Sequence, residues 1–399
     1  KILVSGNDAC GLGAVYGGAT FCSWYPITPS TSVAEGFEKY ASKYRVDPQT
    51  GKNNYISVQA EDELAAVGMA IGANWNGARG FTATSGPGIS LMSEFLGLAY
   101  FAEVPLVIFN IQRGGPSTGM PTRTQQSDIL SCAYASHGDT KHVLLFPEDP
   151  QECFEFSAEA FNLAERLQTP VFVISDLDIG MNDWVTDKFE WDDEQKYDRG
   201  KVLKAEDLDK MDNFGRYLDV DDDGICYRTY PGTHPEKGAF FTRGTSHDEY
   251  ARYTENGDIN EQTLTRLVKK FRTASELVPD PIINLSEKQG SSGVIFYGST
   301  SAAMYEAKDI LNENNIEVDL MRIRSFPFNL DVWEFIENHD LIYVIEQNRD
   351  SQMRTLIMAE GGISAEKLRS LVWFNGDPIQ AKFIAKKIYE RESQQALIT

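Results

Sequence analysis

The sequence predicts an α/β protein in which a doubly wound parallel sheet is followed by a second, smaller α/β unit. Three observations lead to this prediction. Short β-rich runs alternate with helix-length segments over the first part of the chain, the middle is acidic and irregular, and the alternation resumes near Gly293. Such alternation is typical of a parallel sheet covered by helices on both faces, with ligand-binding loops at the carboxyl ends of its strands.

The first unit is predicted to span residues 1–185. Residues 1–6 indicate a strand that leads into a turn, and helix starts are predicted at Thr28-Pro-Ser30 and at Pro147-Glu-Asp-Pro150, the second ahead of a helix over Phe154–Leu167. Six further runs are predicted strands: Thr20–Trp24, Tyr55–Val58, Gly80–Thr84, Leu106–Asn110, His142–Phe146 and Pro170–Ser175.

Residues 186–280 differ in character from the segments on either side. They are acidic, aromatic and irregular, and we expect an extended arm that packs on other elements rather than a third core. Residues 281–399 are predicted to form the second unit. Its expected elements are a strand at Gly293–Gly298, a helix at Ser301–Asn312, and strands near Val318–Ile323 and Leu341–Glu346.

Composition narrows the function classes. A chain of 399 residues with 42% apolar content is long enough for two domains. The net charge of −22 and the isoelectric point near 4.7 argue against a nucleic-acid or anionic-membrane partner. No apolar run approaches the roughly 20 residues needed to cross a bilayer, and no signal-peptide pattern is present.

Five scattered cysteines without a CxxC pair give no local spacing for disulfides, zinc or iron–sulfur clusters. We therefore expect a reducing cytoplasm and no metal site on this chain. Because the first residue is Lys1 rather than Met, we also expect the chain to be part of something longer.

Four motifs carry the candidate chemistry, and three of their residues stand out. Glu63 precedes small residues that can pack where a helix meets a ligand, so its carboxylate suits a buried amidine-like nitrogen. Thr28 presents a hydroxyl just before a helix, a favourable place for an anion. Arg113 follows a strand, and its planar guanidinium can grip a carboxylate at two points. The motifs are Tyr25-Pro-Ile-Thr-Pro-Ser-Thr31, Glu63-Leu-Ala-Ala-Val-Gly-Met-Ala-Ile-Gly72, Thr82-Ala-Thr-Ser-Gly-Pro-Gly88 and Gln112-Arg-Gly-Gly-Pro-Ser-Thr-Gly119, the last continuing to Asp128.

In this order, the four motifs resemble the α subunit of the thiamine-diphosphate-dependent 2-oxoacid:ferredoxin oxidoreductases, most closely the 2-oxoglutarate type. The resemblance implies that the first unit is a pyrimidine-binding domain and that the second is similar to a transketolase C-terminal domain. It implies that Glu63 hydrogen-bonds the cofactor N1′ and supports proton exchange there; Glu61 and Asp62 fit the spacing less well. Thr28 and Arg113 would contact the 2-oxoacid carboxylate. The cofactor-binding residues would also include Tyr25, Pro26, Ile27, Ser85 and Gly86.

The resemblance also implies partners. The family holds the cofactor's diphosphate through a metal with a Gly-Asp-Gly motif and a later Asn, which this chain lacks, and Gly257-Asp-Ile-Asn260 is too short to replace it. A β subunit is therefore expected to carry Mg²⁺ and the [4Fe–4S] clusters in an (αβ)₂ assembly, and a γ-type domain is expected as well. The implied reaction converts 2-oxoglutarate and coenzyme A to succinyl-CoA, CO₂ and reduced ferredoxin, or runs in reverse as CO₂ fixation in a reductive tricarboxylic acid cycle.

Several interpretations stay open. Arg243 and His247 lie in a stretch that looks specific to the 2-oxoglutarate subtype and are candidate contacts for a second carboxylate, although packing of the arm is the favoured interpretation. Asp219, Asp221 and Asp223 imitate a calcium loop, but Tyr230 occupies the twelfth position, which favours an acidic turn.

The alternative functions are an α subunit acting on pyruvate or a branched 2-oxoacid, the E1 component of a lipoyl-linked dehydrogenase, and a catalytically silent scaffold subunit. The Tyr-Pro-Ile-Thr-Pro string disfavours the E1 component, and intact Glu63, Thr28 and Arg113 disfavour the scaffold.

Overall fold

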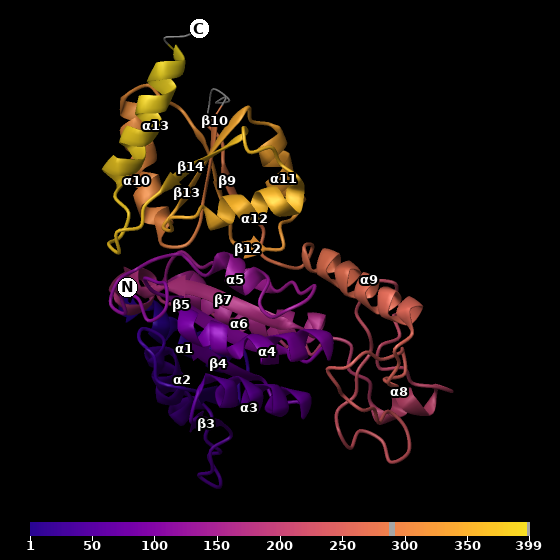
Figure 1. Cartoon of the computed structure of the whole chain (residues 1–399). Coiled ribbons are helices and arrows are strands. Elements are labelled where there is room, and N and C mark those ends of the chain that lie inside the picture. Colours follow the sequence, from indigo (N-terminus) through magenta and orange to yellow (C-terminus); the bar gives the residue numbers. More distant parts are fainter. Residues whose placement is uncertain (287–291, 397–399) are drawn as a thin grey trace.

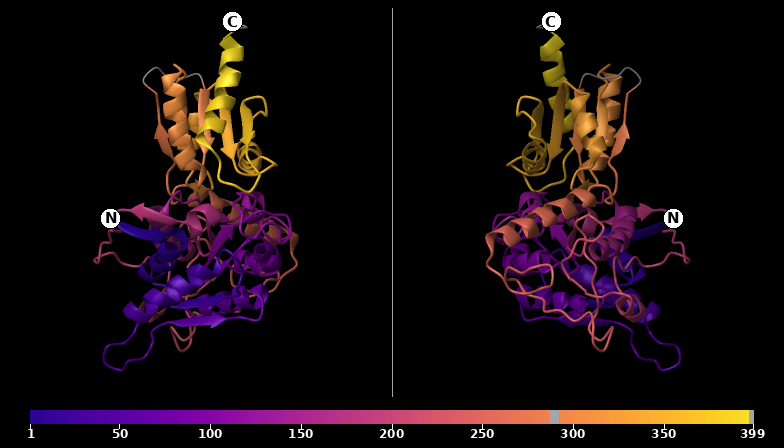
Figure 2. Two further views of the ribbon diagram at one scale, coloured as in Figure 1. Left: turned by 90° about the vertical axis from the view of Figure 1, so that its left-hand side faces the viewer. Right: turned by 90° about the vertical axis from the view of Figure 1, so that its right-hand side faces the viewer.

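The structure is a computed structural model that describes residues 1–286 and 292–396. Two α/β units are stacked, and a largely irregular segment lies along one side of the first unit (Figures 1 and 2). None of the helices in these two ranges combines the length and apolar character that a membrane crossing requires.

The first unit is built on a seven-stranded sheet with the order β12-β6-β7-β5-β4-β2-β3. Six strands are parallel and confirm the predicted runs; the seventh, β12, comes from the later part of the chain and pairs antiparallel with β6. The strands are β2 (Phe21–Trp24), β3 (Ile56–Gln59), β4 (Gly80–Thr84), β5 (Leu106–Gln112), β6 (Val143–Leu145), β7 (Pro170–Asp176) and β12 (Ser325–Phe326).

Helices cover both faces of this sheet, which confirms the doubly wound prediction. Helices α1, α2 and α6 contribute to one apolar cluster, and α3, α4 and α5 contribute to another. Helix α1 packs closely between α2 and α6 because Gly11 and Gly13 lack side chains: a Cβ there would lie 2.5 Å from the Phe37 nitrogen and 2.3 Å from the Phe154 carbonyl oxygen, respectively. The helices are α1 (Gly6–Tyr16), α2 (Thr31–Tyr44), α3 (Glu63–Trp75), α4 (Gly86–Phe101), α5 (Ile129–Ala133) and α6 (Pro150–Leu167).

The predicted N-terminal strand is present, but it does not join the main sheet. Strand β1 (Ile2–Ser5) pairs antiparallel with β8 (Asp183–Thr186) as a two-stranded ribbon next to α7 (Leu177–Met181). This small ribbon brings the two ends of the first unit together.

The second unit contains a five-stranded sheet with the order β14-β13-β10-β11-β9, in which only β9 is antiparallel to its neighbour. Its strands are β9 (Ile282–Asn284), β10 (Ser292–Phe296), β11 (Asp319–Arg322), β13 (Leu341–Glu346) and β14 (Leu368–Val372). Its helices are α10 (Thr300–Glu313), α11 (Leu330–Glu337), α12 (Gln352–Gly361) and α13 (Ala381–Ala396). The predicted elements at β10, α10, β11 and β13 are confirmed, and the others were not predicted.

The intervening arm contains more helix than its sequence indicates. Alongside the short α8 (Ala205–Asp209) it includes α9 (Gly257–Ala274), a helix of 18 residues. Only Leu267, Lys270 and Ala274 of α9 are buried, so it runs over the surface of the first unit. The division into domains at residues 185 and 280 stays a prediction.

One apolar cluster continues from the first unit into the second. It contains Leu106 and Phe172 from the large sheet together with Ile295 and Met321 from the small one. Buried Arg322 also donates to both carboxylate oxygens of Glu152, at 2.6 and 2.8 Å. These contacts fix the second unit above the carboxyl-end loops of the first.

Candidate active site

The candidate site lies at the carboxyl ends of β2, β3, β4 and β5, where α2, α3 and α4 begin. This is the edge of an open α/β sheet at which ligands are expected. Each of the four sequence motifs ends or begins here: Thr28 precedes α2, Glu63 opens α3, Ser85 precedes α4, and Arg113 follows β5.

Glu63 is the first residue of α3, and its side chain is mostly buried, with the residue 7% exposed. The neighbouring Asp62 performs the capping, because its Oδ1 accepts a hydrogen bond of 2.7 Å from the Ala65 nitrogen. The Glu63 carboxylate is therefore not needed for the helix end. In the described part of the chain, no hydrogen bond to that carboxylate is found.

A glycine of the third motif brings Glu63 against the β4–α4 turn. A Cβ at Gly88 would lie 2.0 Å from the Thr84 Oγ1 and 2.9 Å from the Glu63 Cγ. No other residue type fits there without displacing one of these neighbours. The second and third motifs are therefore in direct contact.

Ser85 lies in the same turn and has an unused polar atom. The residue is fully buried, and its Oγ has no hydrogen-bond partner within the described residues. Although Ser85 occupies the N-cap position of α4, its side chain makes no capping hydrogen bond. A buried hydroxyl without a partner is costly, and a ligand group at this turn would satisfy it.

The first and fourth motifs meet through Arg113 and Thr28. The Arg113 Nη1 donates to the Thr28 carbonyl oxygen at 2.6 Å. Arg113 is 7% exposed, and its Nε is buried without a partner among the residues that the structure describes. Thr28, Tyr25 and Pro26 are exposed at the surface of this loop, and Ile27 is half-buried. The guanidinium is thus anchored by one nitrogen, with a donor left for a ligand.

A cavity of about 530 Å³ opens beside Arg113. Gly86 of the third motif and Arg113 of the fourth line it, whereas Glu63, Ser85 and Thr28 are not among its lining residues. The loop after β13 closes another side: the Asn348 Nδ2 donates to the Gln126 carbonyl at 2.9 Å, and the Gln352 Nε2 donates to the Ser127 carbonyl at 2.6 Å.

Sequence reasoning did not single out the contribution of the second unit to this cavity. Asn348 and Arg349 follow a predicted strand, so their place at a strand's carboxyl end was the available signal. Phe374 carries no comparable signal, because the strand before it was not predicted.

Asp128 also lines the cavity, and sequence reasoning quoted it without giving it a role. Burial raises the pKa of its carboxyl to about 6, against the opposing effects of a hydrogen bond from Asn110 and the charge of Arg113. The Asn110 Nδ2 lies 3.2 Å from the Asp128 Oδ2, and a Cβ at Gly86 would lie 2.9 Å from the Oδ1. The charge of the cavity therefore changes at mildly acidic pH.

Arg243 and His247 are not brought to this cavity within the chain. The His247 ring packs 3.9 Å from the ring centre of Tyr217 and 4.9 Å from that of Phe101. Phe101 ends α4, and Gly86 begins it, so about 22 Å of helix separates the two places. Burial lowers the pKa of His247, and the Arg243 guanidinium lies over Phe241 at 4.7 Å. These contacts favour the interpretation of both residues as parts of the arm packing.

Two lysines pair with the acidic turn of the arm. Lys201 pairs with Asp221 at 2.7 Å and with Asp223 at 2.9 Å, and Lys269 lies 3.8 Å from Asp219. Within residues 1–286 and 292–396, no group of three or more potential metal-ligating His, Cys, Asp or Glu side chains is found.

Comparisons with known proteins agree with this geometry. Residues 12–272 match the family described as pyruvate flavodoxin/ferredoxin oxidoreductase, thiamine diphosphate-binding. The chain is 36% identical over 388 residues to 2-oxoacid:ferredoxin oxidoreductase 1, subunit alpha, of Sulfurisphaera tokodaii, covering 95% of this chain and 59% of that protein. It is 35% identical over 359 residues to the 2-oxoglutarate synthase subunit KorA of Methanothermobacter thermautotrophicus, covering 87% and 88%, respectively.

Solved structures give the same result. The fold matches that of 2-oxoglutarate:ferredoxin oxidoreductase from Magnetococcus marinus, solved with 2-oxoglutarate, coenzyme A and succinyl-CoA bound, with a TM-score of 0.86, 30% identity, and coverage of 98% of this chain and 65% of that one. A split-gene transketolase matches with a TM-score of 0.53 and 10% identity over 97% of both chains, a likeness of fold alone.

The chain therefore belongs to the thiamine diphosphate-binding pyruvate flavodoxin/ferredoxin oxidoreductase family, among the α subunits of the 2-oxoacid:ferredoxin oxidoreductases. The chain spans about three fifths of the length of the Sulfurisphaera subunit, since the matched stretch covers 59% of that protein.

Proposed function

We propose that this chain is the α-type subunit of a 2-oxoglutarate:ferredoxin oxidoreductase and supplies the pyrimidine-side half of a thiamine diphosphate site. The observation that carries the proposal is the convergence of four separated motifs at one sheet edge. Glu63 and Gly88 form one wall, and Arg113 with Thr28 forms the wall beside the cavity.

The residues present fit the cofactor. Glu63 offers a buried carboxylate without a partner in the described chain, Ser85 offers an orphaned hydroxyl, and Gly88 lets the Glu63 side chain lie against the β4–α4 turn. When bound, thiamine diphosphate supplies a carbon nucleophile that adds to the 2-oxo carbon and accepts the electron pair released with CO₂.

Each residue of this chain has a distinct part in the proposal. Glu63 holds and exchanges the proton at N1′ of the aminopyrimidine, a role that suits a carboxylate screened from water. Arg113 binds the carboxylate of the 2-oxoacid with the donors that Thr28 does not occupy. Tyr25, Pro26, Ile27 and Gly86 complete the surface on which the cofactor rests.

A β-type partner completes the site. Helices α3 and α4 pack together at Gly68 and Phe95, and they expose Leu64, Met69 and Leu91 beside the Glu63 wall, at 38%, 42% and 50%. A partner covering this apolar face would bring the Mg²⁺ and diphosphate ligands and the [4Fe–4S] clusters to the cofactor, in an (αβ)₂ assembly that reduces ferredoxin and uses coenzyme A. The name of the Sulfurisphaera relative, a subunit alpha, supports a companion subunit.

The choice of 2-oxoglutarate rests on the relatives. Their names include 2-oxoglutarate synthase subunits, and the Magnetococcus enzyme was solved with 2-oxoglutarate bound. Arg113 and Thr28 address only the carboxylate that all 2-oxoacids share, so pyruvate or a branched 2-oxoacid is the alternative. The reverse reaction, CO₂ fixation, uses the same groups.

The test is an anaerobic assay of this chain co-expressed with its β partner, with coenzyme A, thiamine diphosphate, Mg²⁺ and a viologen dye, on 2-oxoglutarate, pyruvate and 2-oxoisovalerate. We expect dye reduction that depends on both chains and has its highest kcat/KM with 2-oxoglutarate. A preference for pyruvate would move the chain to the alternative, and no dye reduction with any substrate would favour a silent scaffold.

A further inference from the structure

Two buried carboxylates at the seam between the arm and the first unit are surrounded by cations. Glu103, at the end of α4, pairs with Arg266 at 2.5 Å and with Lys270 at 2.8 Å. Glu165, on α6, pairs with Arg79 at 3.0 Å and with Arg199 at 3.0 Å. Each of these two carboxylates is therefore already paired with two cations.

Arg216 is a further cation at this seam, and it shares the charge of Glu103 with Arg266 and Lys270 rather than having a carboxylate of its own. It is 3% exposed, and no ion pair of it is found in the part of the chain that the structure describes. Its Nη2 donates to the Glu103 carbonyl oxygen at 2.9 Å, but its Nε and Nη1 are buried without partners. The guanidinium lies between the rings of Tyr217 and Phe240, at 4.8 and 5.5 Å from their centres.

A second buried arginine shares this situation. Arg228 is 4% exposed, and it reaches Glu165 only at 3.4 Å, on a carboxylate that Arg79 and Arg199 already hold. Its Nε is buried without a partner within the described residues. Together with Arg216, it leaves three guanidinium nitrogens without a partner within the described residues.

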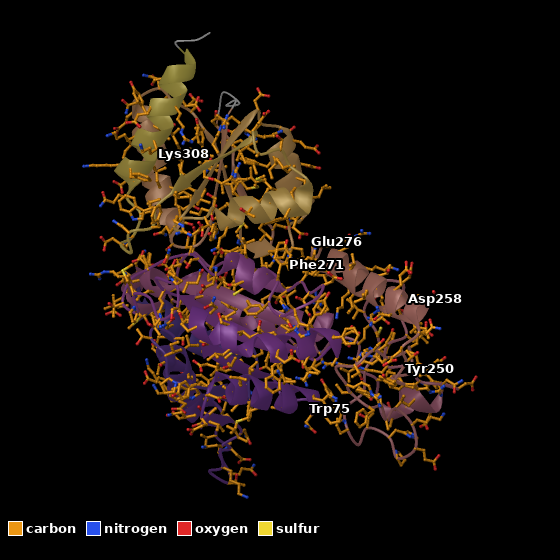
Figure 3. The ribbon with its side chains drawn as sticks, viewed as in Figure 1. Trp75, Tyr250, Asp258, Phe271, Glu276 and Lys308 are labelled. Carbon is orange, nitrogen blue, oxygen red and sulfur yellow. The ribbon has the colours of Figure 1, made fainter. Side chains whose placement is uncertain are left out.

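Both arginines line one small cavity of about 10 Å³. Trp75, at the end of α3, forms part of its wall together with Tyr230 and Phe240, and Figure 3 shows Trp75 where the first unit faces the arm. A volume of this size holds about one water-sized particle. The cavity is too small for a phosphate, a nucleotide or an organic acid.

The occupant of this cavity must accept hydrogen bonds from the unpartnered guanidinium nitrogens and offset their positive charge. A buried donor without a partner costs roughly 1–3 kcal/mol, and an unpaired buried cation costs more. A water molecule would accept hydrogen bonds without neutralising charge, whereas a monatomic anion would accept from guanidinium nitrogens of both arginines that line the cavity and offset the excess of cations. We propose that this cavity between Arg216 and Arg228 is a binding site for a halide-sized inorganic anion, chloride in physiological solution, which fastens the arm to the first unit.

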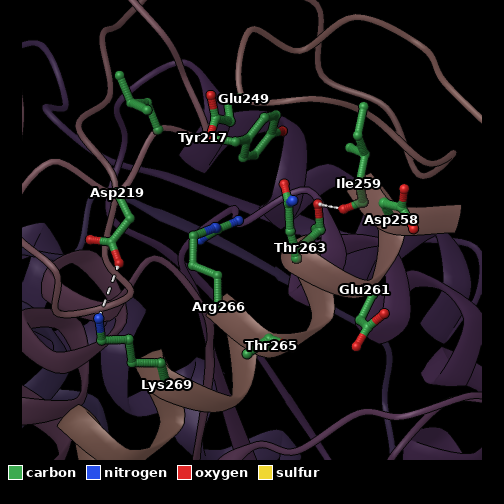
Figure 4. A pocket seen from close by; sticks show the side chains of 12 residues that line it. Tyr217, Asp219, Glu249, Asp258, Ile259, Glu261, Thr263, Thr265, Arg266 and Lys269 are labelled. Carbon is green, nitrogen blue, oxygen red and sulfur yellow. Dashed lines mark hydrogen bonds and ion pairs between the residues drawn. The ribbon is translucent and has the colours of Figure 1, made fainter. Parts of the chain in front are cut away.

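The larger hollow in the arm does not meet the same conditions. It has a volume of about 600 Å³ and lies between α9 and the loop that carries Tyr217 (Figure 4). Its cations are already paired, Arg266 with Glu103 and Lys269 with Asp219. The acids Glu249, Asp258 and Glu261 line its rim, so an anion gains nothing there.

Anomalous diffraction from crystals soaked in sodium bromide tests the proposal on the unaltered protein. We expect a bromide peak within about 3.5 Å of the Arg216 and Arg228 Nε atoms, the reach of a hydrogen bond to a large anion. A well-ordered cavity that holds only water at high bromide concentration would overturn the proposal.

Thermal unfolding gives an independent measurement. In chloride, compared with gluconate at the same ionic strength, the apparent midpoint should rise saturably, by about 2 °C or more. Arg216→Met should abolish this difference, and Arg252→Met, which removes an exposed arm cation, should keep it. Equal midpoints in the two salts, or a chloride effect that persists in Arg216→Met, would each contradict the site.

Discussion

The two ends of helix α4 differ in how their polar groups are satisfied. At its first turn, Ser85 has an unpartnered hydroxyl and Gly86 borders a cavity of about 530 Å³. At its last turn, Phe101 packs against His247, and Glu103 is held by Arg266 and Lys270. One end leaves polar groups for a ligand, and the other uses aromatic packing and ion pairs to hold the arm.

The carboxyl groups near the two ends of α4 also differ, in the direction in which the protein shifts their pKa. Burial would raise the pKa of Glu103, but the charges of Arg266 and Lys270 outweigh it and hold that pKa well below its ordinary value. At the open end, burial raises the pKa of Asp128 to about 6 because Arg113 and Asn110 only partly oppose it. A carboxyl that titrates near neutral pH is typical of functional sites, whereas Glu103 is structural.

The largest expected effect is at the open end. Glu63→Gln should preserve folding and cofactor binding but lower turnover by about 100-fold or more, since an amide cannot exchange the N1′ proton. Glu61→Gln is the matched control, because Glu61 is exposed two residues away. Steady-state assays of the α–β pair measure the turnover of both variants. A near-normal rate in Glu63→Gln, with a slow Glu61→Gln enzyme, would transfer the role to Glu61.

Arg113→Lys should raise the KM for the 2-oxoacid about tenfold, with cofactor binding spared, because an ammonium cannot both hold the Thr28 carbonyl and grip a carboxylate. Arg123→Lys, at a largely exposed arginine of the same loop, is the control. If the rate depends on the 2-oxoacid concentration in the same way in Arg113→Lys and in the unaltered enzyme, Arg113 does not contact the substrate.

Asp128 should make the protein sensitive to pH between about 4 and 6. The pKa is raised in the folded state, so the proton stabilises the fold below the unfolded value, and this stability is lost as pH rises through about 6. The loss should lie between about 1 and 3 kcal/mol in the free energy of unfolding. Denaturant unfolding of Asp128→Asn should show a flatter pH profile; a profile parallel to that of the unaltered protein would argue that Asp128 does not titrate in this window.

The smallest effect is expected at the arm. Arg243→Ala should change kcat/KM by no more than about twofold, equally for 2-oxoglutarate and 2-oxobutyrate, because its guanidinium lies over Phe241 rather than in the cavity. Parallel assays with the two substrates measure this. A loss confined to 2-oxoglutarate would mean that Arg243 contacts the distal carboxylate of the substrate, in the active site of another copy of the chain. The arm end of α4 would then take part in function, contrary to this account.

The sequence was most informative where function and local pattern coincide. The buried strands are short apolar runs, and Glu63, Thr28 and Arg113 stand at strand ends or helix starts, where position alone indicates a ligand site. The closeness of Arg113 to Thr28 follows from this edge, but the hydrogen bond from the Arg113 guanidinium to the Thr28 backbone carbonyl was not predicted.

Other features depend on tertiary contacts. Strand β12 has only two residues and exists because it pairs with β6. Helix α9 is mostly polar, and its buried residues include Lys270, which pairs with Glu103 at 2.8 Å, a contact that no local pattern reveals. Asn348 reaches the cavity only because the second unit docks onto the Gln126 loop.

The central claim is that the open end of α4 is half of a cofactor site. Calorimetric titration of thiamine diphosphate with Mg²⁺ into this chain alone, and into the chain with its β partner, tests it most directly. We expect weak or undetectable binding to the chain alone and tight, Mg²⁺-dependent binding to the pair, which Glu63→Gln leaves in place. Tight, Mg²⁺-dependent binding to the isolated chain would contradict the account.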